Sequence, residues 1–165
     1  MDNKNLGMLE AIQLAMEAEL KAQKFYSNAV NQASNERGKD LLKQLANFEK
    51  KHYEALEKLS KSLKDDGQFI KYEGTTFDEI KGGVKSEVEG KLESNKDNVI
   101  NILNMAIDAE TKAFNRYKEL AEETSDPDGR SMFQTLAEEE SLHRRILSDE
   151  FYQLSNMGGV WSWGD

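Results

Sequence analysis

Apolar residues recur every three or four positions along four long stretches of the chain. This spacing puts them on one face of an α-helix. At about 1.5 Å per residue, helices of roughly 25–30 residues are about 40 Å long. The stripes comprise Leu9, Ile12, Met16, Tyr26 and Val30; Leu41, Leu45, Leu56, Leu59 and Leu63; Ile100, Leu103, Ile107, Phe114 and Ala121; and Met132, Phe133, Leu136, Leu147 and Leu154.

Local signals mark where these helices begin and end. The first two are separated by a polar break at residues 35–38, and the second ends before Gly67, which suits the position after a helix. Asn95 or Asp97 can cap the third helix. The fourth begins after residue 125 or 126, because Pro127 suits a first helical position.

The connections between the helices differ in length, and this predicts the topology. Short loops make an antiparallel hairpin of residues 6–66 and another of residues 96–155. The crossover between them, residues 67–95, contains a capping-box pattern at residues 76–79 and then apolar Val84, Val88 and Leu92, which predict a short helix. We therefore predict one all-α domain, a ferritin-like four-helix bundle of two tandem hairpins with one long crossover.

The C-terminal tail, residues 156–165, contains both tryptophans of the chain, Trp161 and Trp163. Large aromatic side chains more commonly pack in a core or an interface than bind a ligand. We expect the tail to pack across one end of the bundle or in a dimer interface.

The two hairpins are related as an internal repeat. A shift of 91 residues aligns residues 15–56 with residues 106–147 without a gap, and 13 of the aligned pairs are identical. The hairpins therefore look like two copies of one unit. The identical polar pairs are Glu19/Glu110, Lys21/Lys112, Tyr26/Tyr117, Ser34/Ser125, Glu49/Glu140 and His52/His143.

Composition narrows the function classes. Asp and Glu number 31 against 22 Lys and Arg, for a formal net charge of −9, which argues against binding to nucleic acid or to an anionic membrane surface. With no apolar leader and no stretch of about 18 uncharged apolar residues, we expect a cytoplasmic protein. The absence of cysteine excludes disulfides, a thiolate nucleophile and iron–sulfur or rubredoxin-type centres from this sequence.

Both histidines of the chain follow a glutamate at the third position, as Glu49-x-x-His52 and Glu140-x-x-His143. Residues at i and i+3 share a helix face, so a carboxylate and an imidazole can converge on one metal ion. Glu19 and Glu110 occupy equivalent places in the partner helices. Taken singly, each residue also suits a packed core histidine or a glutamate at a solvated edge. Four carboxylates in one core, however, would repel one another without a cation, which favours metal binding.

This pattern resembles the ferritin-like diiron-carboxylate proteins and, among them, the rubrerythrin family, over residues 6–155. The resemblance implies that Glu19 and Glu110 are ligands, that Glu49 and Glu140 bridge or chelate, and that each histidine binds one metal. It also implies iron at both positions, although manganese or a mixed iron–manganese pair suits the same donors. Tyr26 and Tyr117, each seven residues after a ligand glutamate, are expected beside the site as hydrogen-bond donors or as core tyrosines.

The chain departs from the rubrerythrin pattern at two points. Ala113 stands where that family usually has a further glutamate ligand, so we expect both histidines to remain ligands in both oxidation states. The cysteine-ligated rubredoxin domain is also absent from this sequence. The site therefore resembles the symmetric four-glutamate, two-histidine set of bacterioferritin.

The resemblance implies an oxidoreductase that reduces hydrogen peroxide or dioxygen. It implies an external electron donor, such as a rubredoxin-like protein or a flavoprotein, and a homodimer. Two alternatives stay open from the sequence: a ferroxidase subunit of an iron-storing cage and a metal-free helical interaction module.

Overall fold

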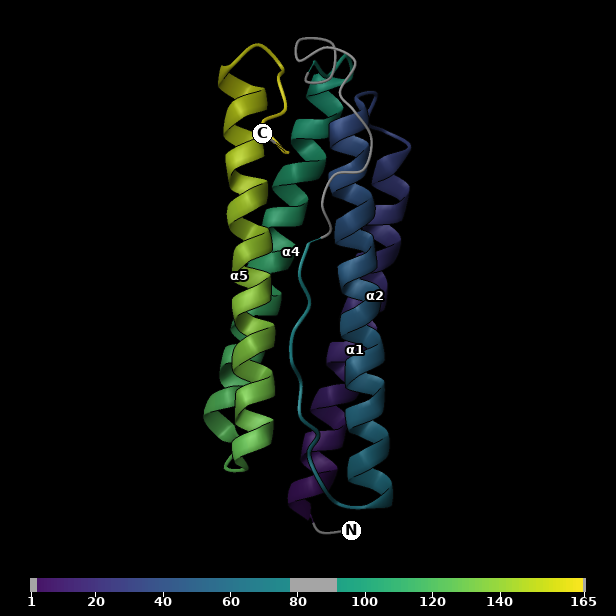
Figure 1. The fold of residues 1–165 in the computed structure, drawn as a ribbon, viewed down its shortest axis with the longest axis vertical. Helices are drawn as coiled ribbons and strands as arrows, with labels where there is room; N and C mark the ends of the chain where they lie inside the picture. The colour runs from purple at the N-terminus through teal and green to yellow at the C-terminus, as the bar shows by residue number, and fades with distance from the viewer. Residues whose placement is uncertain (1–2, 78–91, 165) are drawn as a thin grey trace.

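The computed structural model describes residues 3–77 and 92–164, which form a bundle of four long helices (Figure 1). They are α1 (Asn3–Val30), α2 (Glu36–Asp65), α4 (Lys96–Glu123) and α5 (Pro127–Asn156). The predicted all-α architecture is confirmed, since a single antiparallel bridge between Leu92 and Val160 is the only β-pairing among the described residues. None of the described helices combines the length and the apolar character needed to cross a membrane.

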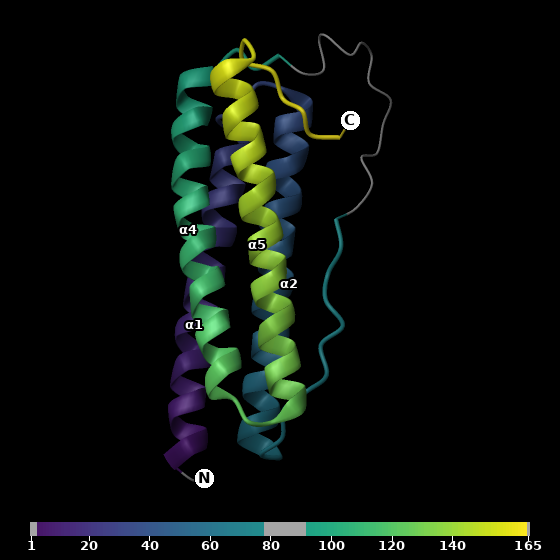
Figure 2. The same ribbon diagram turned by 90° about the vertical axis from the view of Figure 1, so that its left-hand side faces the viewer.

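The helices pair as the connection lengths predict. Helix α1 packs along α2 and α4 packs along α5, and α1 also contacts α4. After α2, residues 68–77 run along the outside of the bundle beside α2 and α5, without helix or strand (Figure 2). This crossover makes α2 and α4 run in the same direction. The short helix predicted around Val84 and Val88 falls outside the described residues.

Side-chain caps set the start of two helices. The Asn35 side chain accepts hydrogen bonds from the backbone N–H groups of Arg37 at 2.9 Å and Gly38 at 3.3 Å. These two residues therefore belong to α2, and the polar break is shorter than the sequence suggests. Asp126 caps α5 in the same way and Pro127 is its first residue, as predicted. An N-cap side chain of this kind satisfies backbone donors that the first helical turn leaves unpaired.

The apolar core is divided into two parts by a layer of buried polar side chains. Each helix contributes to both parts, and the polar layer lies between them along every helix. Buried members of one part are Ile12, Leu56, Leu59, Tyr117, Phe133 and Leu136. Buried members of the other part, on the opposite side of the layer, are Tyr26, Leu41, Leu45, Leu103, Leu147 and Leu154. Close packing on both sides holds the backbone around the polar layer rigid.

Glu93, at the end of the crossover, joins three segments at one end of the bundle. Its carboxylate accepts hydrogen bonds from the backbone and hydroxyl of Ser34 and from the backbone of Asn35, between α1 and α2. It also accepts from the Asn95 backbone at 2.8 Å and from Trp161 Nε1 at 3.2 Å. The structure thus places Trp161 in the core, where it is fully buried. The tail folds back across the bundle end.

We expect Glu93 to make stability depend on acidity. Burial by itself would raise the pKa of Glu93, but the hydrogen bonds from Ser34, Asn95 and Trp161 hold it below its ordinary value of 4.5. The ionised carboxylate therefore adds stability above that value, and this stability is lost as the pH falls through the lower folded-state pKa. The difference in free energy of unfolding between the wild type and Glu93→Gln should shrink from about pH 6 to about pH 3. Urea denaturation at each pH measures it, and a constant difference would contradict the assignment.

Candidate metal centre

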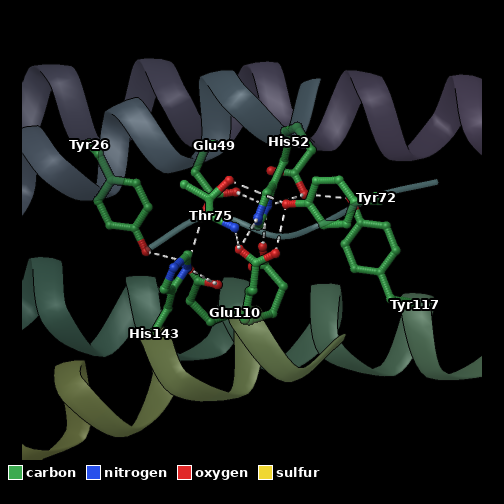
Figure 3. A network of polar contacts seen from close by, with 11 residues as sticks. Tyr26, Glu49, His52, Tyr72, Thr75, Glu110, Tyr117 and His143 are labelled. Atoms are coloured by element: carbon green, nitrogen blue, oxygen red, sulfur yellow. Dashed lines mark hydrogen bonds and ion pairs between the residues drawn. The ribbon is translucent and has the colours of Figure 1, made fainter. Parts of the chain in front are cut away.

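The six predicted ligand residues converge in the polar layer at the middle of the bundle (Figure 3). The i, i+3 spacing places each glutamate–histidine pair on the inner face of its helix. All six side chains are buried, with at most 2% of any residue exposed. They are Glu19 on α1, Glu49 and His52 on α2, Glu110 on α4, and Glu140 and His143 on α5.

The six residues form two overlapping groups of four. In each group, one ligand atom per residue lies within 4.8 Å of the others. The first group contains His52 and Glu19, and the second contains His143 and Glu110. Glu49 and Glu140 belong to both groups. These shared carboxylates therefore lie where they could contact both ions of a metal pair.

The donor atoms face one another and leave hydrogen-bonding capacity unused. Within the described part of the chain, one carboxylate oxygen of each site glutamate and Nδ1 of each histidine have no hydrogen-bond partner. His52 Nδ1 lies only 2.7 Å from Glu140 Oε1, but the two atoms lack hydrogen-bond geometry. Buried polar atoms are normally paired, because leaving one unpaired costs about 1–3 kcal/mol. Convergent unpaired oxygen and nitrogen donors fit a bound cation, so these residues could hold metal.

Three of the six site residues, Glu49, Glu140 and His52, have raised pKa values and hold protons strongly. Burial raises the pKa of Glu49 well above its ordinary value, and the charge of Glu140 raises it further. Burial also raises the pKa of Glu140, together with the charges of Glu110 and Glu19. Burial alone would lower the pKa of His52, but the carboxylates of Glu19 and Glu140 raise it well above its ordinary value. A metal ion bound by these residues would displace those protons.

Metal binding should therefore release protons. Carboxylates and imidazoles bind metal only when deprotonated, so the apparent affinity should rise with pH by about tenfold per pH unit for each proton released. Calorimetric titration with Co²⁺ in two buffers of different ionisation enthalpy measures the number released. Equal heats in the two buffers would show that no proton leaves.

Two tyrosines cross the bundle to orient the glutamates of the opposite hairpin. The Tyr26 hydroxyl on α1 donates to Glu110 Oε1 at 2.6 Å, and the Tyr117 hydroxyl on α4 donates to Glu19 Oε1 at 2.5 Å. Burial and the neighbouring carboxylates raise the pKa of both tyrosines well above the ordinary value, so both phenols stay protonated. Each bond occupies one oxygen of its glutamate, and the other oxygen, Oε2, has no hydrogen-bond partner among the described residues.

Sequence reasoning missed Glu139, which lies behind His52. Its carboxylate accepts hydrogen bonds from the Tyr72 hydroxyl at 2.7 Å and the Thr75 backbone at 3.1 Å, and it lies 3.4 Å from His52 Nε2. Tyr72 and Thr75 belong to the crossover, so this segment closes the site on the α2–α5 side (Figure 3). One signal was available: Glu139 aligns with apolar Phe48 in the internal repeat.

The opposite side of the site is open to a cavity of about 330 Å³ between α1 and α4. A volume of about 30 Å³ per water molecule makes this ample for a small oxidant. The cavity wall includes Ala113, where the rubrerythrin pattern has its further glutamate, and all four site glutamates line it. The other small residues of the wall are Ala18, Ala22 and Ala109.

Comparison with known proteins agrees with this architecture. The sequence model of the rubrerythrin family matches residues 1–80 and 101–157. A solved structure of a hypothetical protein from Pyrococcus furiosus is similar in fold, with a TM-score of 0.70, 23% sequence identity and coverage of 90% of each chain. Comparison with curated protein sequences gave no match. The family match covers most of the chain, and the chain therefore belongs to the rubrerythrin family.

Proposed function

We propose that this protein is a diiron oxidoreductase that reduces hydrogen peroxide or dioxygen. The observation that carries the proposal is the pair of overlapping ligand groups, which contain unpaired donor atoms and whose four glutamates line a cavity. A bound iron pair would supply two electrons, one from each ion, to an oxidant that reaches it. Manganese at one or both positions would fit the same donors.

The protein residues would hold the metal pair and supply its surroundings. Glu49 and Glu140 would contact both ions, because each belongs to both groups. Carboxylates suit this position, since they can chelate one ion or bridge two as the charge of the pair changes. His52 and His143 would each contribute one nitrogen at Nδ1, the atom that faces the glutamates.

The tyrosines would hold two ligand glutamates in place, and the cavity would admit the oxidant. Tyr26 and Tyr117 keep their protons at neutral pH and hold Glu110 and Glu19 in place through hydrogen bonds. Apart from the site glutamates, the charged side chains of the cavity wall are cationic Lys21, Lys112 and Arg116 and a single carboxylate, Asp108. With a metal pair bound, the charge of the site glutamates would be offset and the remaining charged groups of the wall would be net cationic. This would suit a neutral oxidant better than a further ferrous ion, and so favours peroxide or dioxygen reduction over ferroxidase activity.

Turnover would need electrons from outside the chain. Reduction of hydrogen peroxide consumes two protons and two electrons and yields two water molecules. The sequence has no cysteine and so offers no thiolate ligands for a second iron centre. We propose a rubredoxin-like protein or a flavoprotein as the donor, and a homodimer as the assembly.

The fully reduced, iron-loaded protein should consume about one hydrogen peroxide per diiron site and then stop, since each site stores two electrons. Anaerobic titration with peroxide, followed by the ferric absorption, measures this stoichiometry, and a parallel titration with dioxygen compares the two oxidants. Adding a reduced rubredoxin-like protein should restore consumption. Sustained NAD(P)H-driven turnover by the purified chain alone would contradict the proposal, and elution as a large cage in size-exclusion chromatography would favour iron storage.

A further inference from the structure

The internal repeat is broken beside the metal centre, at the residue that precedes each ligand glutamate of α2 and α5. This residue is Phe48 before Glu49, but Glu139 before Glu140. Both lie in the polar layer and both are buried, with 3% and 9% of the residue exposed. Glu139 on α5 lies beside His52 of α2, and Phe48 on α2 lies beside His143 of α5. The difference between the repeats therefore gives the two histidines different surroundings.

His52 has a carboxylate behind it. Its Nδ1 faces the site glutamates and its Nε2 lies 3.4 Å from Glu139 Oε2. Glu139 is itself held by two donors from the crossover, Tyr72 and Thr75. When Nδ1 binds a metal, the ring proton stays on Nε2 and can be donated to Glu139. Such a bond fixes the ring orientation and makes the imidazole a stronger ligand.

His143 has aromatic rings in the corresponding place. Its ring centroid lies 4.7 Å from that of Phe48 and 5.5 Å from that of Phe77, both in edge-on arrangements. Nε2 of His143 has no hydrogen-bond partner among the described residues. Within the described part of the chain, packing alone holds the Nε2 side of this ring and offers its buried N–H no acceptor, which weakens His143 as a ligand relative to His52.

We infer that Glu139 is a positioning residue that makes the two metal positions unequal, so that the position of His52 binds metal more tightly and fills first. The inference rests on metal binding in the proposed function and is independent of which oxidant is reduced. It concerns this chain in particular, because the inequality arises from one position at which the two repeats differ.

Anaerobic titration of the metal-free protein with Co²⁺ tests the inference through the visible absorption of the bound ion. The wild type should bind two ions in two separate steps. Glu139→Gln, which keeps the shape of the side chain but removes its charge, should weaken the tighter step by about 10–100-fold and leave the weaker step unchanged. His52→Ala should abolish the tighter step and His143→Ala the weaker one.

Two further variants separate positioning from general damage. Glu138→Gln changes the exposed neighbour of Glu139 on α5 and should leave both steps as in the wild type. Tyr72→Phe removes one donor to Glu139 and should weaken the tighter step by less than Glu139→Gln does. It also keeps the test available if Glu139→Gln does not fold.

A spectroscopic signal reports the contact itself. In the Co²⁺ protein, the paramagnetically shifted N–H proton of His52 should exchange slowly with water, and Glu139→Gln should shift that signal while the His143 signal stays in place. Equal affinities of the two wild-type steps, or equal weakening of both by Glu139→Gln, would overturn the inference. Failure of the wild type to bind two Co²⁺ ions would instead overturn the proposed function.

Discussion

Replacing Glu49 and Glu140 together by alanine is expected to abolish binding of the metal pair while the protein remains helical. These are the two residues that belong to both ligand groups, so their loss removes two of the four donors from each group. Iron content after anaerobic loading, measured by elemental analysis, should fall well below two ions per chain. The ferric absorption should disappear with it.

The same variant should separate metal binding from folding. A metal present at about one hundred times its Kd stabilises the folded state by about 2.7 kcal/mol, because it binds only that state. Thermal unfolding of the wild type should therefore shift upward on metal loading, and that of the double variant should not. In the metal-free state the double variant should be at least as stable as the wild type, since burial and mutual repulsion already oppose ionisation of Glu49 and Glu140.

A matched control replaces two glutamates that lie on the same helices but are exposed, Glu54 and Glu138. Glu54→Ala/Glu138→Ala should load metal as the wild type does. If iron still loads at two ions per chain when Glu49 and Glu140 are both replaced, the assignment of these ligands is wrong.

The largest effect on stability is expected from Trp161→Ala. Trp161 is fully buried in the core and its ring lies against Gly38 of α2, where a Cβ atom would come within 2.4 Å of it. The Trp161 indole also donates to Glu93 at 3.2 Å. Its removal leaves a large cavity and takes away one of the hydrogen bonds to Glu93, and should lower the free energy of unfolding by about 3–5 kcal/mol. Urea denaturation of the metal-free protein measures the change.

Two comparisons show whether the loss arises from this contact. Trp163 is only partly buried and packs on Phe77, with ring centroids 5.2 Å apart, so Trp163→Ala should cost less. Gly38→Ala should also destabilise the wild type, because the added methyl group collides with the Trp161 ring. In the Trp161→Ala background this collision is absent, so the double variant should lose less stability than the sum of the single losses. A Trp161→Ala variant within about 1 kcal/mol of the wild type would contradict the role of the tail.

The helices and the convergence of the six site residues could be predicted because both depend on the spacing of residues that are close together in the chain. Apolar residues at helical intervals predicted four helices, and Asp126-Pro127 predicted where the last one begins. The i, i+3 pairs, repeated in both hairpins, predicted one inner face for Glu49 with His52 and for Glu140 with His143. These inferences succeeded because helical periodicity and a repeat constrain the fold without knowledge of distant contacts.

The tertiary structure alone decided which residues surround that centre. Nothing in the spacing of Tyr72 or Thr75 indicates that the crossover passes behind His52 and holds Glu139 there. The docking of Trp161 against Gly38 likewise joins residues that lie far apart in the chain. Local sequence determined the helices and the inward-facing donors, because periodicity acts over a few residues. The path of the crossover and the tail decided how each histidine is held, because those contacts form only once the bundle has assembled.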